Sequence, residues 1–386
     1  MRVVGLMSGT SYDGIDVAVA ELEFLDGDIA MTPLGAQMVP YDAELTDRIG
    51  ALLPPNQTTI ERVCQLDTLL GRAYGEAAAL AVRAYGGDLV VSHGQTVFHW
   101  IDDGRAQGSL QLGRPAWIAA RTGLPVVSDL RSADIAAGGQ GAPLVPAFDV
   151  LLLGVDRPRA ALNLGGIANA TVIDRFAHVL GYDLGPANAL TDLAARRFFG
   201  TPYDIDGAYA AAGKVDDEFL QVLLAEPYYR REPPKSTGKE LFHAGYLERF
   251  RPAGLSGEDV LATLTELTAR VVAAELDRHG VTEVLASGGG VRNPVLMRRL
   301  GELTSASVGT IDALGVPSDA KEAYAFAVLG FLSWHGLPGA VPSVTGAREA
   351  RILGSYTPGA GPLRLPAPAV GTPRHLRIQP EIRTGT

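Results

Sequence analysis

The first 22 residues, MRVVGLMSGTSYDGIDVAVAEL, constrain the fold more than any other stretch. An apolar run at 3–6 breaks into SGTSYDGID, which is rich in glycine, hydroxyl and aspartate, and an apolar, β-branched run follows at 15–22. This pattern predicts two strands paired as a hairpin. A plain turn needs only about one or two such residues. The loop therefore raises the question of a ligand.

The composition of the loop suits phosphate binding. Glycines let backbone N–H groups approach an anion without a Cβ in the way. Gly9 and Gly14 would free the turn, and Asp13 and Asp16 would hold Mg²⁺ directly or through water. The alternative is an ordinary hairpin loop whose Asp and Ser side chains satisfy their own backbone.

The pattern returns in the middle of the chain, where AALNLGGIANATVID again places a Gly-Gly break between two apolar runs. This predicts two related halves, each an α/β domain with a largely covered sheet. We expect domains at 1–130 and 131–358, and a Pro- and Gly-rich irregular tail at 359–386. The chain has no Walker A sequence. If it binds ATP, a pair of glycine-bearing hairpins, one from each half, is the arrangement that fits.

The clearest helical pattern runs through residues 256–280, with Ser256 and Asp259 spaced as a capping box and Gly280 placed to end it. The strand EVLAS, the glycines at 288–290 and the Asn293-Pro294 helix start come next. A strand, a glycine loop and a helix N-terminus form a natural phosphate or nucleotide niche. A second helical period covers 58–85, and DLVVSHGQTVFH predicts a buried strand running into a polar loop.

Composition narrows the class of protein. A chain of 386 residues with 47% hydrophobic residues buries a sizeable core, and its net charge of -10 disfavours nucleic acid or an anionic membrane as partner. Cys64 is alone, so neither a disulfide nor a cysteine metal cluster is possible within the chain, and we expect it to be buried. No apolar segment reaches the length of a membrane span. We expect a cytoplasmic protein acting on a small molecule.

Four side chains outside the glycine loops are candidates for chemistry. Asp183, before a Gly-Pro turn that opens a helix, suits a general base or, alternatively, a helix cap. Arg131 and Asp134 beside GGQGAP suit a substrate contact or a surface pair. Glu322 lies in an apolar helix, where a carboxylate needs a cleft or a partner, and we expect its neighbour Lys321 to be solvated. The spacing of His93 and His99 does not favour a metal site.

Together these stretches resemble one family, anhydro-N-acetylmuramic acid kinase of bacterial peptidoglycan recycling. The matching pieces are GLMSGTSYDGID, SHGQTVFH, DLRSADIAAGGQGAPLVP, LNLGGIANAT, GYDLGPANAL, PPKSTGKELF, SGGGVRNPVLM and KEAYAFA, with SVTGAREARILGSY extending the match to about residue 356. The resemblance implies two ribonuclease-H-like α/β domains of the actin-like ATPase fold, with ATP and an amino sugar in the cleft between them. It also implies Mg²⁺, and we expect a homodimer.

The resemblance assigns roles to individual residues. The ATP site would comprise Gly9, Thr10, Ser11, Tyr12, Asp13, Gly14, Ile15, Asp16, Gly165, Gly166, Gly288 and Gly289. Thr96, Arg131, Asp134 and Glu322 would face the sugar, and Asp183 would take a proton from the water that opens the anhydro ring. The product would be N-acetylmuramic acid 6-phosphate with ADP.

Two other functions stay open at this point. One is a kinase of another sugar on the same fold, and the other is a non-catalytic, actin-like ATPase module. The chain also departs from the usual family pattern at Tyr12, Asp149, Leu184, Ala187 and His243.

Overall fold

The computed structural model describes residues 1–9, 11–238 and 240–380. The chain divides into two compact units, Met1–Leu152 with Ala320–Thr386, and Leu153–Asp319. Residues 131–152 and 320–358, which the sequence pattern placed with the second half, thus lie in the first unit. The reason is that helix α12 (Lys321–Trp334) packs on strands β1 and β2 of the first unit.

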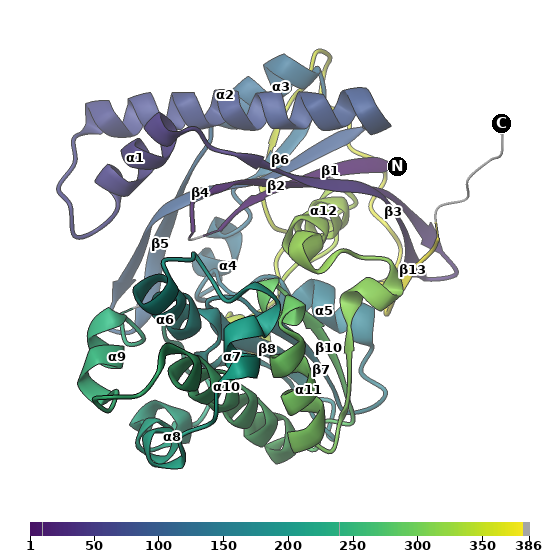
Figure 1. Ribbon diagram of the computed structural model, residues 1–386. Helices are drawn as coiled ribbons and strands as arrows, with labels where there is room; N and C mark the ends of the chain where they lie inside the picture. Colours follow the sequence, from purple (N-terminus) through teal and green to yellow (C-terminus); the bar gives the residue numbers. More distant parts are fainter. Residues whose placement is uncertain (10, 239, 381–386) are drawn as a thin grey trace, which may run out of the picture. The chain divides into compact units, whose positions relative to one another are not determined.

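The first unit is built on one mixed sheet, coloured purple to blue at its centre in Figure 1. Its order is β12-β6-β4-β1-β2-β3-β13, and β5 pairs with β4. The strands are β1 (Arg2–Ser8), β2 (Gly14–Leu25), β3 (Asp28–Pro40), β4 (Leu89–Asp102), β5 (Arg105–Leu112), β6 (Val126–Ser128), β12 (Ser355–Thr357) and β13 (Leu376–Ile378). The predicted N-terminal hairpin is confirmed, because β1 and β2 pair antiparallel.

Helices cover both faces of this sheet. Helix α2 (Ile60–Tyr85) packs on one face, and its Leu66, Leu70 and Tyr74 join sheet residues such as Leu6 and Val17 in one core. Helix α12 packs on the other face and is buried on nearly all sides, which explains why its sequence is apolar after Lys321 and Glu322. The remaining helices of the unit are α1 (Ala43–Leu52), α3 (Pro115–Thr122), α4 (Ser132–Ala136), α5 (Pro146–Leu153) and α13 (Pro342–Thr345).

The second unit has a five-stranded mixed sheet of order β11-β10-β7-β8-β9. The strands are β7 (Arg159–Leu164), β8 (Ile167–Ile173), β9 (Val179–Pro186), β10 (Glu283–Ser287) and β11 (Ser307–Thr310). Its helices are α6 (Asn188–Phe199), α7 (Ala208–Ala212), α8 (Asp217–Leu224), α9 (Ala244–Phe250), α10 (Gly257–Arg278) and α11 (Pro294–Leu303). Short 3₁₀ turns lie at η1 (Ile205–Gly207), η2 (Pro227–Arg230), η3 (Gly289–Arg292), η4 (Ile311–Leu314) and η5 (Ser318–Ala320).

The two sheets share one topology. In each, three consecutive antiparallel strands are followed by two parallel ones: β3-β2-β1-β4-β6 in the first unit and β9-β8-β7-β10-β11 in the second. This confirms the two related ribonuclease-H-like halves and the α/β class predicted from the sequence.

The predicted helix signals act as expected. Ser256 Oγ accepts the N–H of Asp259 at the start of α10, and Asn293 Oδ1 accepts two N–H groups at the start of α11. Two expectations were wrong. Cys64 is exposed on α2, and the polar residues after 91 continue strand β4 instead of forming a loop.

The C-terminal segment from Gly359 is largely irregular as far as residue 380, but its β13 pairs in parallel with β3. Within the part of the chain that the structure describes, no helix is both long and apolar enough to cross a bilayer.

Candidate active site

The N-terminal hairpin loop is anchored by hydrogen bonds to Gln95 on β4. Ser8 Oγ lies 2.7 Å from Gly14 O and 2.7 Å from Gln95 Oε1, so its proton is shared between two acceptors. Gln95 Nε2 donates to Gly9 O at 3.2 Å. Sequence reasoning missed Gln95, although its place in SHGQT, directly after a buried run, is a signal that a polar partner is needed.

The two loop glycines, Gly9 and Gly14, have different structural roles. A Cβ on Gly14 would lie 2.6 Å from both Met38 Sδ and Val39 O, so this glycine lets β2 pack closely on β3. A Cβ on Gly9 would meet only Ser11 Oγ at 4.0 Å, so the Gly9 backbone is open to a ligand. Thr10, a predicted contact, lies outside the described residues.

Two further loop residues anchor the hairpin. Ile15 is buried in the core, so only its backbone can face a ligand. Tyr12 has a φ of 42° and packs against the same core beside Gly50 of α1. The tyrosine that departs from the family pattern therefore ties the loop to a helix.

Asp16, beside this loop, is influenced by two other carboxyl groups. Burial, together with the charges of Glu322 and Asp13, raises the pKa of Asp16 to about 7. Asp13 is exposed, and its Oδ1 accepts the Ser11 hydroxyl at 2.8 Å. Negative charge that is this poorly compensated suits a hard divalent cation. Among the described residues, however, no group of three or more His, Cys, Asp or Glu side chains is placed to hold a metal.

Arg131 lies next to His93 and is mostly buried. Its Nε and Nη2 lie 3.0 and 2.7 Å from His93 Nε2, and its Nη1 donates to Gly141 O at 2.6 Å. Burial and the Arg131 charge hold the pKa of His93 well below its usual value. The imidazole is therefore neutral, with Nδ1–H donating to Gly94 O at 2.7 Å and Nε2 free to accept from Arg131.

Asp134 and Thr96 lie in the same unit but have other partners. Asp134 is fully buried, and its two oxygens accept the Gly141 N–H and the Thr345 hydroxyl, each at 2.8 Å. It thus fixes the glycine-rich loop and forms no surface pair with Arg131. Thr96 Oγ1 accepts a hydrogen bond from Gln111 Nε2 at 3.0 Å.

The start of α12 carries a buried ion pair that sequence reasoning missed. The expectation that Lys321 is solvated was wrong: its side chain is only 6% exposed, and Nζ lies 2.7 Å from Asp149 Oδ1. The departure at Asp149 therefore supplies the counterion that a buried lysine requires. The charges of Lys321 and Arg131 lower the pKa of the neighbouring Glu322, but burial outweighs them and keeps this pKa above its usual value.

The second unit brings its two glycine loops together. The carbonyls of Gly165 and Gly166, between β7 and β8, accept N–H groups from the start of α6 at 2.9–3.0 Å. At Gly288, φ is +83°, and a Cβ there would lie 2.5 Å from Asn163 Oδ1. Gly289 has open space by comparison, with Asn188 Nδ2 at 3.8 Å. Gly166 and Gly289 are thus the positions where a ligand can approach the backbone.

Asp183 lies on edge strand β9 opposite Asn169, immediately before an extra residue that bulges the strand. A bulge next to a functional side chain re-aims it. Thr237 N–H donates to Asp183 Oδ2 at 3.0 Å, and burial raises the pKa of the carboxyl despite that bond. Asp183 makes no helix cap, because α6 begins at Asn188 after Ala187.

The departures close to these elements fit their surroundings. Leu184 and Ala187 are buried in the sheet core of the second unit. His243 caps α9 by accepting the Gly245 N–H on Nδ1 at 3.0 Å, as an asparagine would.

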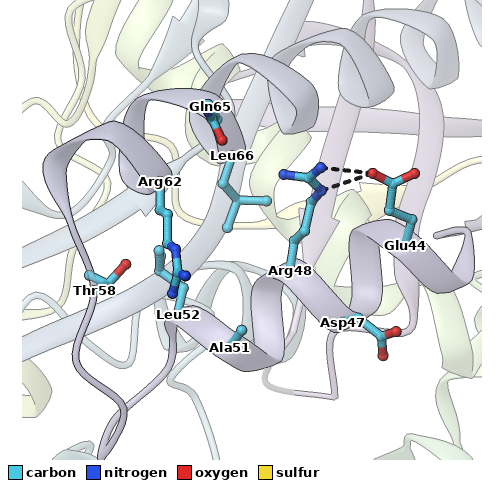
Figure 2. Close-up of a pocket in the computed structure, with 9 residues that line it drawn as sticks. All are labelled: Glu44, Asp47, Arg48, Ala51, Leu52, Thr58, Arg62, Gln65 and Leu66. Atoms are coloured by element: carbon cyan, nitrogen blue, oxygen red, sulfur yellow. Dashed lines mark hydrogen bonds and ion pairs between the residues drawn. The ribbon is translucent and has the colours of Figure 1, made fainter.

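A hollow of about 650 Å³ lies elsewhere, between α1 and α2. Figure 2 shows its wall of exposed charged side chains, among them Arg48 paired with Glu44. None of the predicted site residues that the structure describes lines it. Its volume alone does not make it the site of chemistry.

Comparisons with known proteins agree along nearly all of the chain. The family model described as anhydro-N-acetylmuramic acid kinase matches residues 1–359. The anhydro-N-acetylmuramic acid kinase of Streptomyces coelicolor is 56% identical, covering 98% of this chain and 99% of its own. That of Streptomyces avermitilis is 54% identical, covering 98% and 100%.

Among solved structures, the activator of 2-hydroxyisocaproyl-CoA dehydratase from Clostridium difficile, with bound ADPNP, is 14% identical. It covers 85% of this chain and 92% of its own at a TM-score of 0.39.

Proposed function

Because the chain belongs to the anhydro-N-acetylmuramic acid kinase family, we propose that it opens the anhydro ring of 1,6-anhydro-N-acetylmuramic acid with water and phosphorylates O6 with ATP. The products are N-acetylmuramic acid 6-phosphate and ADP, and the role is peptidoglycan recycling. The observation that supports this most is Asp183, a carboxylate at a bulged strand end with a raised pKa.

Asp183 is the general base of the proposal. It takes a proton from the water that attacks C1, while the C1–O6 bond breaks and O6 attacks the γ-phosphoryl group of ATP. Water thus supplies the oxygen at C1, as in an inverting glycosidase. The leaving oxygen is captured by phosphoryl transfer, where such a glycosidase would protonate it with a general acid. A carboxyl pKa raised by burial brings the base closer to the operating pH.

The glycine loops carry the ATP in this proposal. Backbone N–H groups at the open Gly9, Gly166 and Gly289 suit phosphate oxygens. The other predicted nucleotide contacts, Ser11 to Asp16 with Gly165 and Gly288, belong to the same loops.

Asp13 and Asp16 would hold Mg²⁺. Two carboxylates together with nucleotide phosphates are an ordinary ligand set for this ion. When bound, Mg²⁺ offsets negative charge on the phosphates. Asp16 must first lose the proton that burial and the charges of Glu322 and Asp13 favour.

Arg131 and Glu322 would face the sugar with Thr96, and Asp134 would shape the loop that presents Arg131. The guanidinium suits the carboxylate of the lactyl group or a ring oxygen. We also propose that the protein acts in the cytoplasm, where ATP is present. The proposal also includes a homodimer, for which light scattering should give about twice the 40.5 kDa chain mass.

The test offers ATP and Mg²⁺ with either the anhydro sugar or ordinary N-acetylmuramic acid. We expect ADP and a sugar 6-phosphate from the anhydro sugar, and turnover lost in Asp183→Asn while ATP still binds. Phosphorylation of ordinary N-acetylmuramic acid alone would instead indicate another sugar kinase. Sugar-independent ATP hydrolysis would indicate a non-catalytic ATPase module.

A further inference from the structure

A buried lysine lies in an irregular loop beside Asp183. The side chain of Lys235 is only 2% exposed, although the segment from Arg231 to Gly238 has no helix or strand. Lysine is almost never buried without a partner. Here Nζ lies 3.1 Å from Glu275 Oε1 on α10 and donates to Tyr229 O at 3.3 Å.

Aromatic rings complete the surroundings of the ammonium group. Nζ lies 5.5 Å from the ring centre of Tyr182 and 5.3 Å from that of Tyr228, within range of cation–π attraction. The Tyr182 hydroxyl donates to Glu275 Oε2 at 2.8 Å and lies 2.7 Å from His279 Nε2. The lysine is therefore enclosed by groups from β9, η2 and α10.

The same loop holds Asp183. Strand β9 is an edge, and the Asp183 N–H that would bond to a further strand donates instead to Lys235 O at 3.3 Å. Two residues later, Thr237 N–H donates to Asp183 Oδ2 at 3.0 Å. The ring of Tyr228 faces Lys235, and the hydroxyl of the same tyrosine donates to Asp183 O at 2.7 Å. Every one of these contacts comes from the loop or from a wall of the lysine pocket.

We propose that Lys235 is a positioning residue for Asp183. Its ion pair with Glu275 anchors a loop that has no other regular structure, and the anchored loop directs one carboxylate oxygen to the Thr237 N–H. The other oxygen is then the one that takes the proton. This inference rests on the proposed function, because it assumes that Asp183 is the base.

The decisive variants are Lys235→Met and Lys235→Met with Glu275→Gln. The single variant removes the anchor and takes the lysine partner from the buried Glu275 carboxylate, so it also loses stability. Glu275 keeps the Tyr182 hydroxyl and has Arg278 Nη1 at 3.7 Å. The double variant removes both charges and should recover most of the melting temperature. We expect kcat with the anhydro sugar to fall about tenfold to a hundredfold in both, as for loss of a hydrogen bond to a charged group. KM for ATP should change less than about twofold.

Two further readouts separate positioning from folding. The acid limb of the kcat/KM pH profile should move to higher pH in the double variant, because the Thr237 N–H no longer favours the ionised carboxylate. Hydrogen exchange at the amides of 235–238 should accelerate. Lys214→Met, at an exposed lysine of the same unit, is the matched control and should leave all readouts unchanged.

The outcomes are distinguishable. A double variant with wild-type kcat and pH profile would overturn the inference and leave the proposed function intact. So would recovery of kcat in step with the melting temperature, which means that the pair only stabilises the fold. A folded wild-type protein that does not convert the anhydro sugar would overturn the proposed function, and the inference with it.

Discussion

Asp16→Asn should make the protein more resistant to unfolding at pH 8 than the wild type, and the advantage should vanish toward pH 4. Burial and the charges of Glu322 and Asp13 raise the pKa of Asp16 from 3.8 to about 7. Between these values the folded state keeps a proton that the unfolded state has released. The free energy of unfolding therefore falls as pH rises through this range and is level above it.

The size of the effect follows from the two pKa values. A change from 3.8 to about 7 corresponds to about 4 kcal/mol at about 1.36 kcal/mol per pH unit. The Asp16 side chain is partly exposed, and solvent screening reduces this to about 2 kcal/mol. Asparagine stays neutral at every pH. The stability difference between variant and wild type should therefore grow by about 2 kcal/mol between pH 4 and pH 8.

Urea unfolding over this pH range measures the difference directly. Asp47→Asn, at an exposed aspartate on the neighbouring α1, is the matched control and should show no such trend. A difference for Asp16→Asn that stays constant within about 0.5 kcal/mol, or that shrinks as pH rises, would refute the reasoning about the carboxyl cluster.

Three other substitutions test separate parts of the account. Lys321→Met should cost about 3–5 kcal/mol of unfolding free energy because it removes the ammonium group paired with the buried Asp149 carboxylate, and adding Asp149→Asn should recover most of it; an unchanged urea midpoint for Lys321→Met would contradict this. His93→Phe removes the acceptor for Arg131, so kcat/KM for the sugar should fall about tenfold or more with KM for ATP unchanged, and equal effects on both substrates would count against it. Ser256→Ala removes the cap of α10 and should cost about 1 kcal/mol in denaturant unfolding, with no effect on KM.

Local patterns predicted the parts of the fold that local chemistry determines. The hairpin at the N-terminus, its repeat around Gly165 and the caps at Ser256 and Asn293 depend on residues a few positions apart. Such signals can be read from spacing alone.

Features that depend on distant residues escaped the sequence reasoning. Strand β4 continues through a polar stretch because His93 meets Arg131 and Gln95 meets Ser8, partners that are far away along the chain. Lys321 is buried for the same reason, since its counterion Asp149 belongs to another helix. Periodicity cannot identify such partners, because it registers only how often apolar residues recur.

The sequence pattern also failed to predict which segments belong to which domain. The chain returns to its first sheet at α12 after completing the second unit, and Gly5 allows the close approach, since a Cβ there would lie 2.1 Å from Ala323 O. A boundary read along the sequence assumes that each domain is continuous. It cannot anticipate a helix that crosses back.

In the proposed reaction, water opens the anhydro ring while the γ-phosphoryl group of ATP captures O6. The most direct measurement runs the reaction in ¹⁸O-labelled water and locates the label by mass spectrometry and NMR. We expect one label at C1 of the sugar 6-phosphate and none in its phosphate group. Label in the phosphate, or a product without label at C1, would contradict the proposed mechanism and with it the role of Asp183.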